Sequence, residues 1–462
     1  MDKFQKLREE NPVFIYKSCT IADNGSDIDV SYEFVFPGLA AFRPGWSFTK
    51  PASYAGNAAE DAVFQRLAFS LGMAEAVSYW KAACSPRFIV ECGTLSPEQA
   101  DWWKKLYFNG LGEFFYINNI SAEPDSFIQI ECTQNTAESP EMSEKELKGC
   151  LVPIGGGKDS ALTIETLVSA GMECKCYSIN SRRSVQETVR AAGLPEESLI
   201  TSKRRFDRSL IELNNKGYLN GHTPFSAIVA FSAEITAYLN GLKYVVLSNE
   251  SSANESTVAG MSVNHQYSKS FEFEHDFHCY EEKFLKSGVY YFSFLRPLSE
   301  FQIAEMFVTH KKYLDVFRSC NLGSKVSPDI WCGNCPKCLF VFLILSPFAD
   351  CQKLTEIFGK DLLDEPEMLE YFRELTGQTE HKPFECVGSV DEVNLAASMT
   401  VQRLEAAGRQ LPLLLREYRE SSLYKPETIS KRLESCRNHY DSNNLLPAEF
   451  EAILKNEMER IL

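Results

Sequence analysis

Three consecutive glycines, Gly155 to Gly157, stand between an apolar segment and a segment with helical spacing. The residues read Leu151-Val-Pro-Ile-Gly-Gly-Gly-Lys-Asp-Ser-Ala161, and the helical spacing continues to Ala170. Because glycine has no Cβ atom, the backbone N–H groups of such a loop can close around an anion. The helix that follows directs the positive end of its dipole at the same point. The order strand, glycine loop, helix therefore predicts a site for a nucleotide phosphate.

Two common phosphate loops do not fit these residues. A Walker A loop requires Ser or Thr after its lysine, but Asp159 follows Lys158, and no glycine stands five residues before Gly157. The dinucleotide-binding pattern fails because its last glycine is missing. An ordinary glycine-rich turn before a helix is a further alternative.

The loop resembles the S-G-G-x-D-S loop of the ATP pyrophosphatases, which cleave ATP to AMP and diphosphate. The matching residues are Gly156, Gly157, Asp159 and Ser160. Gly155 stands where that family usually has serine, so one hydroxyl contact to diphosphate is missing. The positive charge of Lys158 is expected to compensate for it.

The composition excludes several classes of protein. Hydrophobic residues make up 44% and charged residues 24% of the 462 residues, which is ordinary for a globular chain of two or three domains. The polar N-terminus and the lack of long apolar runs predict neither a signal peptide nor a membrane-spanning helix. The 15 scattered cysteines indicate a reducing environment, so we expect a cytoplasmic protein. The net charge of −16 argues against nucleic acid as a partner.

Strand and helix patterns divide the chain into three parts. Residues 1–145 are expected to form an N-terminal α+β domain, with strands at 27–36 and 126–132 and a helix at 64–83. Residues 146–350 alternate strand and helix, which predicts an α/β domain with a parallel, doubly wound sheet. Its strands are expected at 151–154, 173–179, 243–247 and 290–294, and its helices at 160–170, 225–240 and 299–308. Residues 351–462 are expected to be helical, at 354–363, 368–375, 392–407 and 450–462.

Polar residues follow the second and third strands of the α/β domain, where ligands of such sheets bind. Asn180-Ser-Arg-Arg-Ser184 follows the second strand, and Lys203-Arg-Arg205 comes later. Their guanidinium groups suit a diphosphate, with a solvated helix face as the alternative. Glu250 and Glu255 follow the third strand, and carboxylates there suit Mg²⁺ on ATP phosphates. A helix cap is the alternative for this segment.

Histidines and cysteines supply two further groups of candidate residues. Four of the seven histidines lie among aromatic and charged residues and suit a pocket wall with proton carriers: His222, His265, His275 and His278. A structural role is the alternative for each. Cys332, Cys335 and Cys338 have the spacing C-x₂-C-x₂-C, and Cys320 is a fourth thiol upstream. Four such thiolates suit structural Zn²⁺; reduced buried thiols or a catalytic iron–sulfur cluster are the alternatives.

The whole pattern resembles the UDP-N-acetylmuramoyl-L-alanyl-L-glutamate epimerases of bacterial peptidoglycan synthesis, a branch of the ATP pyrophosphatase (PP-loop) superfamily. The segments that carry the resemblance are Pro153–Ser160, Asn220–Phe225, Leu247–Glu255, Tyr267–Glu272, Arg296–Leu298, the cysteine cluster and His381–Gly388. The resemblance implies a sheet of the adenine nucleotide alpha hydrolase-like type. It also implies an ATP- and Mg²⁺-dependent inversion of the terminal L-glutamate of a UDP-linked muramoyl dipeptide, through an acyl-adenylate that releases AMP.

The resemblance also implies roles for individual residues. ATP is expected on Gly155, Gly156, Gly157, Lys158, Asp159, Ser160, Asn180 and Glu250, with Mg²⁺ on Glu250 or Glu255. Substrate contacts are expected from Arg182, Arg183, His222, Lys269 and Arg296. Lys158 neutralises the diphosphate, and the candidate proton carriers are His265, His275, His278 and Cys386. The competing functions are another PP-loop enzyme, which amidates or inserts sulfur into tRNA or a deazapurine, and a nucleotide sensor without catalysis.

Overall fold

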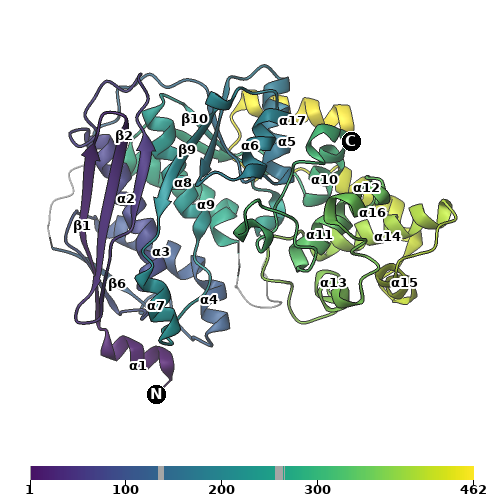
Figure 1. Ribbon diagram of the computed structural model, residues 1–462, viewed down its shortest axis with the longest axis horizontal. Coiled ribbons are helices and arrows are strands. Elements are labelled where there is room, and N and C mark those ends of the chain that lie inside the picture. The colour runs from purple at the N-terminus through teal and green to yellow at the C-terminus, as the bar shows by residue number, and fades with distance from the viewer. Residues whose placement is uncertain (1, 134–139, 255–263, 265) are drawn as a thin grey trace.

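One continuous sheet connects the first two predicted parts of the chain (Figure 1). The computed structural model describes residues 2–133, 140–254, 264 and 266–462. Within these residues, eleven strands form the sheet in the order β11-β10-β7-β8-β9-β4-β2-β1-β5-β6, and β3 pairs with β2. The strands are β1 Val13–Asp23, β2 Asp27–Phe36, β3 Ala40–Phe42, β4 Gly45–Thr49, β5 Arg87–Val90, β6 Gln129–Cys132, β7 Cys150–Pro153, β8 Cys174–Ile179, β9 Leu199–Arg205, β10 Tyr244–Leu247 and β11 Tyr290–Ser293.

The half of the sheet that contains the glycine loop is parallel, as predicted. β11, β10, β7, β8 and β9 pair in parallel, with α5 Lys158–Ser169 on one face and α8 Phe225–Leu239 on the other. Alternate residues of β7 divide between two cores, because successive side chains of a strand point to opposite faces. Leu151 packs in the core that contains α8, and Val152 packs in the core that contains α5. The predicted parallel sheet with helices on both faces is thus confirmed.

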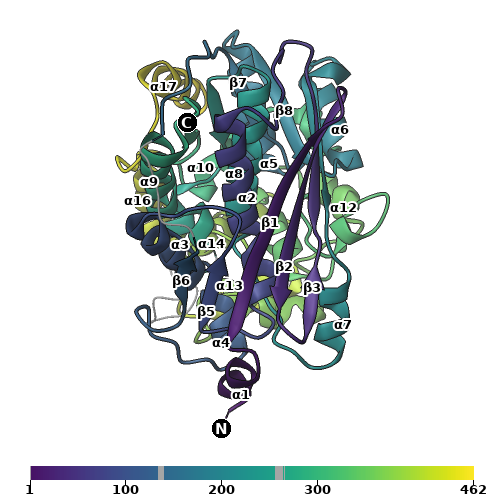
Figure 2. The ribbon, with the colours of Figure 1, turned by 90° about the vertical axis from the view of Figure 1, so that its left-hand side faces the viewer.

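The N-terminal half of the sheet is mixed and joins the parallel half through β4. β4 pairs antiparallel with β9, where Trp46 lies opposite Arg204. β2 and β1 continue the sheet in antiparallel pairs, and β5 and β6 extend it in parallel pairs. Figure 2 shows β1, β2 and β3 at the surface, with α2 Ala62–Trp80 behind them. The boundary expected near residue 145 falls between β6 and β7, and the sheet continues across both sides of it.

The residues after β11 form a helical part beside the parallel half (Figure 1). Its central helix, α11 Pro336–Leu345, is buried from Lys337 to Leu345 and contacts α10, α12, α13 and α14. Among the described residues, the structure has no helix that is both long and apolar enough to cross a membrane. The other α-helices of the described residues are α1 Lys3–Glu10, α3 Pro97–Gly110, α4 Gly112–Ile117, α6 Arg183–Ala191, α7 Ser209–Asn215, α9 Phe271–Tyr280, α10 Glu300–Thr309, α12 Cys351–Phe358, α13 Leu369–Leu375, α14 Val390–Ala406, α15 Leu413–Glu420, α16 Ile429–Arg437 and α17 Ala448–Ile461.

Candidate active site

The glycine loop joins β7 to α5, and its conformation explains why glycine stands at its centre. Gly156 has φ +85°, which only glycine adopts readily, and a Cβ atom there would lie 2.4 Å from Ser184 Oγ. Gly157 is the N-cap of α5, and no side chain caps this end of the helix. The N–H groups of the first turn of α5 are therefore available to an anion.

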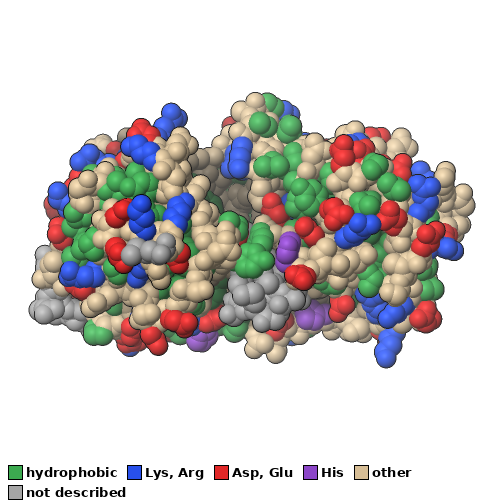
Figure 3. Space-filling view, turned by 90° about the horizontal axis from the view of Figure 1, so that it is seen from below, with side chains coloured by type: hydrophobic (Ala, Val, Ile, Leu, Met, Phe, Trp, Pro, Cys, Tyr) green, Lys and Arg blue, Asp and Glu red, His purple; other side chains and the backbone are tan. Residues whose placement is uncertain are grey.

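A cavity of about 430 Å³ opens at the carboxyl ends of β7, β8 and β10, and the glycine loop forms part of its wall. Small-molecule sites typically measure about 300 to 1,000 Å³. Seen from below, the surface has a hollow between the N-terminal part on the left and the helical part on the right (Figure 3). The apolar wall includes Ile154, Ile179, Val185, Phe225 and Val229. The polar wall includes Asp159, Ser160, Arg182, Glu250, Lys269, Glu300, Arg318, Lys337 and Cys386.

Lys158 lies beneath the glycine loop, where it pairs with two carboxylates. Its ammonium group contacts Asp159 and Glu300, and its side chain is almost completely buried. Burial raises the pKa of Glu300 to about 7, although Lys158 opposes this shift. Burial would also raise the pKa of Asp159, but Lys158 and Lys337 hold it below its usual value. Lys158 is therefore a buried cation behind the loop rather than part of the cavity wall.

Lys269 and Cys386 form a second pair in the same cavity. Lys269 Nζ donates a hydrogen bond to Cys386 Sγ over 3.0 Å, and Lys337 Nζ donates to the backbone oxygen of Cys386. Burial disfavours the ammonium form, but Cys386 and Glu250 raise the pKa of Lys269 well above its usual value. An ammonium group this close stabilises a thiolate over a thiol. The pair can therefore act as a nucleophile or as a proton carrier.

Glu250 faces this pair from the end of β10. It is buried, and its pKa is raised by burial and then by the negative charge of Asp159. Arg296, predicted to contact the substrate, is fully buried and does not line the cavity. Its guanidinium donates to the backbone oxygens of Glu250, over 2.6 Å, and Lys269, and to the carboxylate of Glu274 at 2.8 Å. Arg296 thus positions two residues of the cavity.

Of the predicted proton carriers, Cys386 lines the cavity and the two described histidines do not. His275 is exposed on α9, and His278 lies 3.4 Å from Glu282. The apolar face of α9 packs into the core, so both histidines project from its other faces. His265 lies outside the described residues. The structure therefore places His275 and His278 outside this cavity, and it does not bring them together with Cys386.

Other predicted ligand residues differ in position. Arg182 lines the cavity, but Arg183 is exposed and its Nε donates to Glu187 at 2.7 Å. His222 pairs with Glu113 at 3.5 Å and is not part of the cavity wall. The Asn180 side chain bonds the backbone of β9 and also points away from the cavity. Glu255 lies outside the described residues. Of the predicted residues that follow β8, Arg182 therefore lines the cavity, whereas Asn180 and Arg183 do not.

Four charged residues of the cavity wall were not predicted from the sequence: Glu300, Arg318, Asp329 and Lys337. Glu300 opens the helix after β11, Arg318 precedes the cysteine cluster, and Lys337 lies within it. The rule that ligands bind beyond the carboxyl ends of parallel strands points to Glu300, because β11 belongs to the same sheet. No local sequence pattern predicts that Lys337 lines the cavity. The spacing of the cysteines around it indicates a metal site, which does not require a lysine at this position.

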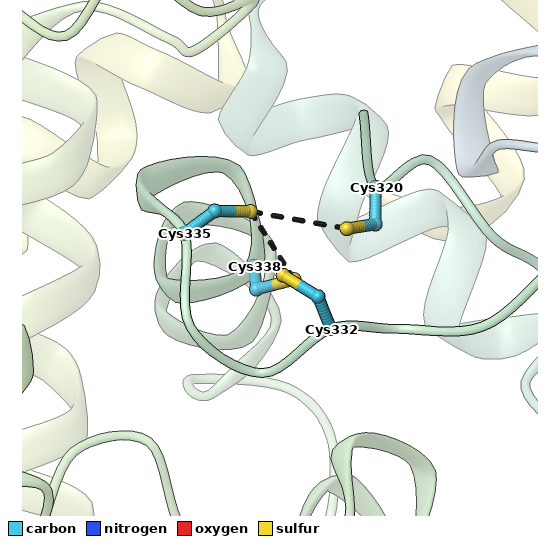
Figure 4. A group of neighbouring side chains, drawn as sticks. All are labelled: Cys320, Cys332, Cys335 and Cys338. Carbon is cyan, nitrogen blue, oxygen red and sulfur yellow. Dashed lines mark hydrogen bonds between the residues drawn. The ribbon is translucent and has the colours of Figure 1, made fainter. Parts of the chain in front are cut away.

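Four cysteine side chains meet next to the cavity (Figure 4). The Sγ atoms are 3.9 Å apart for Cys320 and Cys335, 3.7 Å for Cys332 and Cys338, and 3.5 Å for Cys335 and Cys338. All four lie within 4.8 Å of one another, and none is in a disulfide. Four thiolates on one tetrahedral Zn²⁺, with bonds of about 2.3 Å, lie about 3.8 Å apart. The residues present therefore fit a structural zinc ion.

Sheet, loop and cavity place the chain among the α/β proteins that bind ligands at the carboxyl ends of parallel strands. A family model of the MurL N-terminal domain matches residues 5–294, and a model of the MurL C-terminal domain matches residues 316–427. The chain belongs to the MurL family.

Curated relatives are similar over most of the chain. A protein of Salinispora tropica is 39% identical over 328 residues, which are 70% of this chain and 70% of the relative. A protein of Xanthomonas oryzae pv. oryzae is 36% identical over 356 residues, 76% of this chain and 77% of the relative. A protein of a Micromonospora species is 37% identical over 331 residues, 71% of this chain and 73% of the relative. All three are named UDP-N-acetyl-alpha-D-muramoyl-L-alanyl-L-glutamate epimerase. No solved structure matches the chain.

Proposed function

We propose that this protein converts the terminal L-glutamate of UDP-N-acetylmuramoyl-L-alanyl-L-glutamate to D-glutamate, using ATP and Mg²⁺ and releasing AMP and diphosphate. The observation that carries the proposal is that a single cavity contains both the glycine loop and the Lys269–Cys386 pair. The names of the three relatives support the substrate and the inversion. The match to the S-G-G-x-D-S loop supports a sheet of the PP-loop type.

The chemistry of the substrate explains why such a reaction uses ATP. A proton next to a carboxylate is weakly acidic, because the ion resists further negative charge. ATP supplies an adenylyl group, which neutralises the carboxylate and leaves an ester-like carbonyl that can delocalise a carbanion. In this step a carboxylate oxygen bonds to the α-phosphorus, and the bond to diphosphate breaks. After inversion, water cleaves the acyl–phosphate bond and releases AMP.

The loop side of the cavity suits the diphosphate. The backbone N–H groups at the start of α5 are available to phosphate oxygens, and Ser160 adds a hydroxyl in the cavity wall. Lys158 lies buried behind the loop and offsets negative charge in front of it. Mg²⁺ takes one or two protein carboxylates and keeps its other ligands as water or phosphate oxygens. Glu250, in the cavity wall, would be such a carboxylate ligand.

The other side of the cavity suits proton transfer. Cys386, held as a thiolate by Lys269, removes the α-proton onto Sγ, and the electron pair of the C–H bond moves into the activated carbonyl. Lys337 holds the backbone of Cys386, and Arg296 holds the backbone of Lys269. The thiolate and its cation are therefore fixed from both sides. A proton returned to the opposite face of Cα gives the D-residue.

The test is product analysis in D₂O with the full-length protein. The proposal expects ATP-dependent appearance of D-glutamate in the substrate, deuterium at its α-carbon, and AMP and diphosphate as the nucleotide products. ADP in place of AMP, or a product without solvent deuterium, contradicts the proposal. Turnover that requires ammonia or sulfide would identify another PP-loop enzyme. ATP binding without AMP release, whichever muramoyl nucleotide is supplied, would identify a nucleotide sensor.

A further inference from the structure

The four-cysteine cluster is joined to the glycine loop through the two residues before Cys320. Cys320 lines the cavity itself, and the two residues before it touch the loop. The Arg318 backbone N–H donates to the backbone oxygen of Gly156 over 2.6 Å. A Cβ atom on Gly157 would lie 3.2 Å from Ser319 Cβ, so these two backbones pack closely. A change in the position of Cys320 would therefore move the wall on which the glycine loop rests.

The other end of the cysteine segment also reaches the cavity. Lys337 stands between Cys335 and Cys338 in the first turn of α11, and its side chain is buried. Its Nζ donates to the backbone oxygen of Cys386. After Lys158, the positive charge of Lys337 also lowers the pKa of Asp159. One segment of chain, from Arg318 to Cys338, therefore contributes to both the phosphate side and the thiolate side of the cavity.

The segment between these contacts has little regular structure of its own. Between Phe317 and α11, its one helical element is a single short turn, Gly323–Lys325. A loop of this kind is held by side chains, and here the cysteine sulfurs accept backbone hydrogen bonds. Gly323 N–H donates to Cys320 Sγ over 3.1 Å, and Asn334 N–H donates to Cys332 Sγ over 3.4 Å. Hydrogen bonds of this type orient thiolate ligands of a metal.

We infer that Cys320, Cys332, Cys335 and Cys338 bind one Zn²⁺, and that this ion fixes Arg318, Ser319 and Lys337 so that the glycine loop is held in its ATP-binding form. The Sγ distances favour a single ion, because an iron–sulfur cluster places several atoms between its thiolates and holds them farther apart. The free energy of binding such an ion stabilises the fold of the loop that supplies the ligands. This inference rests on the proposed function, because it takes ATP to be the ligand of the glycine loop.

Coupling between two sites is reciprocal, so it can be measured from either side. If zinc strengthens ATP binding, then ATP strengthens zinc binding by the same factor. Typical couplings correspond to about 5- to 150-fold changes in affinity, and we expect at least about tenfold here because the contacts are direct. The affinity for ATP, held as its magnesium complex, is measured by calorimetry on zinc-loaded protein and on protein stripped with a chelator. The affinity for zinc is measured by chelator competition with and without ATP.

The fluorescence of Trp331 can report whether the segment that carries the cysteines changes when the metal is removed. Trp331 precedes Cys332 and packs between Phe317, at a ring distance of 5.2 Å, and Phe358, at 4.5 Å. Loss of zinc is expected to change the fluorescence of Trp331. Circular dichroism then shows whether the rest of the fold is retained. Protein substituted with Co²⁺ is expected to show the visible absorption of a tetrahedral thiolate site.

Variants separate the metal from its contacts. Cys332→Ser is expected to lower zinc content and weaken ATP binding about tenfold; Cys279→Ser, an exposed cysteine on α9, is expected to leave both unchanged. Ser319→Gly loosens the link between Cys320 and the loop and is expected to weaken ATP binding while zinc stays bound. If the zinc-stripped protein or Cys332→Ser unfolds, Ser319→Gly still tests whether the contact between the cysteine segment and the glycine loop strengthens ATP binding.

The possible results are distinct. Purified protein that contains no zinc and binds none, or that contains an iron–sulfur cluster, overturns the metal assignment. Equal ATP affinity with and without zinc, or normal ATP affinity in Ser319→Gly, overturns the coupling. If neither the loaded nor the stripped protein binds ATP, the proposed function fails as well, because its phosphate loop then has no ligand.

Discussion

At the residue scale, three lysines and three carboxylates lie close together at the cavity. The lysines are Lys158, Lys269 and Lys337, and the carboxylates are Asp159, Glu250 and Glu300. Burying charges costs free energy unless each is paired and hydrogen-bonded, and apolar residues of similar volume are often more stabilising. A cluster of this kind in a cavity is therefore more typical of a reactive site than of a structural core.

Replacement of the thiol tests its role in proton transfer. Cys386→Ser leaves a hydroxyl that Lys269 cannot ionise near neutral pH, so incorporation of deuterium into the product should fall by about 10²-fold or more. The glycine loop is unchanged, so isotope exchange between labelled diphosphate and ATP, which reports adenylation, should continue. Both rates are measured on the same preparation. Equal losses in the two reactions would show that Cys386 is not a proton carrier but supports the site as a whole.

Glu300 should make stability depend on pH. Its pKa is raised from 4.5 to about 7 in the folded protein, so in that range the unfolded chain is ionised while the folded protein keeps its proton. The stabilisation is complete below about pH 4.5 and is lost as pH rises through 7. The shift corresponds to about 3 kcal/mol.

Glu300→Gln removes this titration, because glutamine stays neutral at all pH values. Relative to the variant, the free energy of unfolding of the unmodified protein should fall by up to about 3 kcal/mol between pH 4 and pH 8. Urea denaturation of both proteins at several pH values gives the difference directly. A difference that does not change with pH would show that Glu300 titrates alike in the folded and unfolded states.

At the element scale, a buried ion pair joins α2 to β9 at the point where β9 pairs with β4. Glu75 of α2 is fully buried, and it accepts hydrogen bonds from Arg204 at 2.5 and 2.8 Å and from Trp46 at 2.8 Å. Removing one partner of a buried pair leaves an uncompensated charge, which typically costs about 3 to 5 kcal/mol. The carboxylate of Glu75 therefore connects α2 with both β4 and β9.

Arg204→Met should therefore destabilise the protein by about 3 to 5 kcal/mol, measured by urea denaturation. Arg205→Met is the matched control on the same strand. The side chain of Arg205 is half exposed and lies 3.6 Å from Asp29, so its loss should cost less than about 1 kcal/mol. If the two variants have equal stability, the buried pair does not hold α2 to β9.

The elements that the sequence predicted best are those with a regular pattern of burial. The strand expected at 27–36 is β2 Asp27–Phe36, in which buried residues alternate with half-buried or exposed ones. β9 was not predicted, because it ends in Lys203–Arg205, a basic run that suggested a diphosphate site instead. The partner of Arg204 is Glu75, which is 129 residues away in the chain. No local pattern can reveal such a pairing.

At the scale of the whole molecule, the cavity combines segments that are far apart in the sequence. The glycine loop was predictable because strand, loop and helix are continuous in the chain. The choice among the candidate proton carriers was not, since it depends on which face of α9 packs inward and on where the segment with Cys386 lies. Resemblance to a family brought Cys386 into the candidate set, and only the fold separates it from His275 and His278.

The N-terminal part of the molecule contacts the segment that carries this thiol. Tyr116 of α4 packs against Phe384, two residues before Cys386, with ring centroids 5.4 Å apart. Tyr116 is 38% exposed, so the contact lies at the surface and its loss should leave the core intact. The contact suggests that the N-terminal part helps to hold Cys386 opposite the glycine loop.

Tyr116→Ala should therefore slow deuterium incorporation by about tenfold, because a displacement of the reacting group by about 1 Å is enough for a loss of this order or more. ATP affinity should be unchanged, since α4 does not contribute to the cavity wall. Ile117→Ala, at the neighbouring and more exposed position, is the control and should behave like the unmodified protein. A parallel loss of ATP affinity in Tyr116→Ala would indicate general loosening of the fold. Normal rates in this variant would show that the thiol is positioned entirely by the helical part and Lys269.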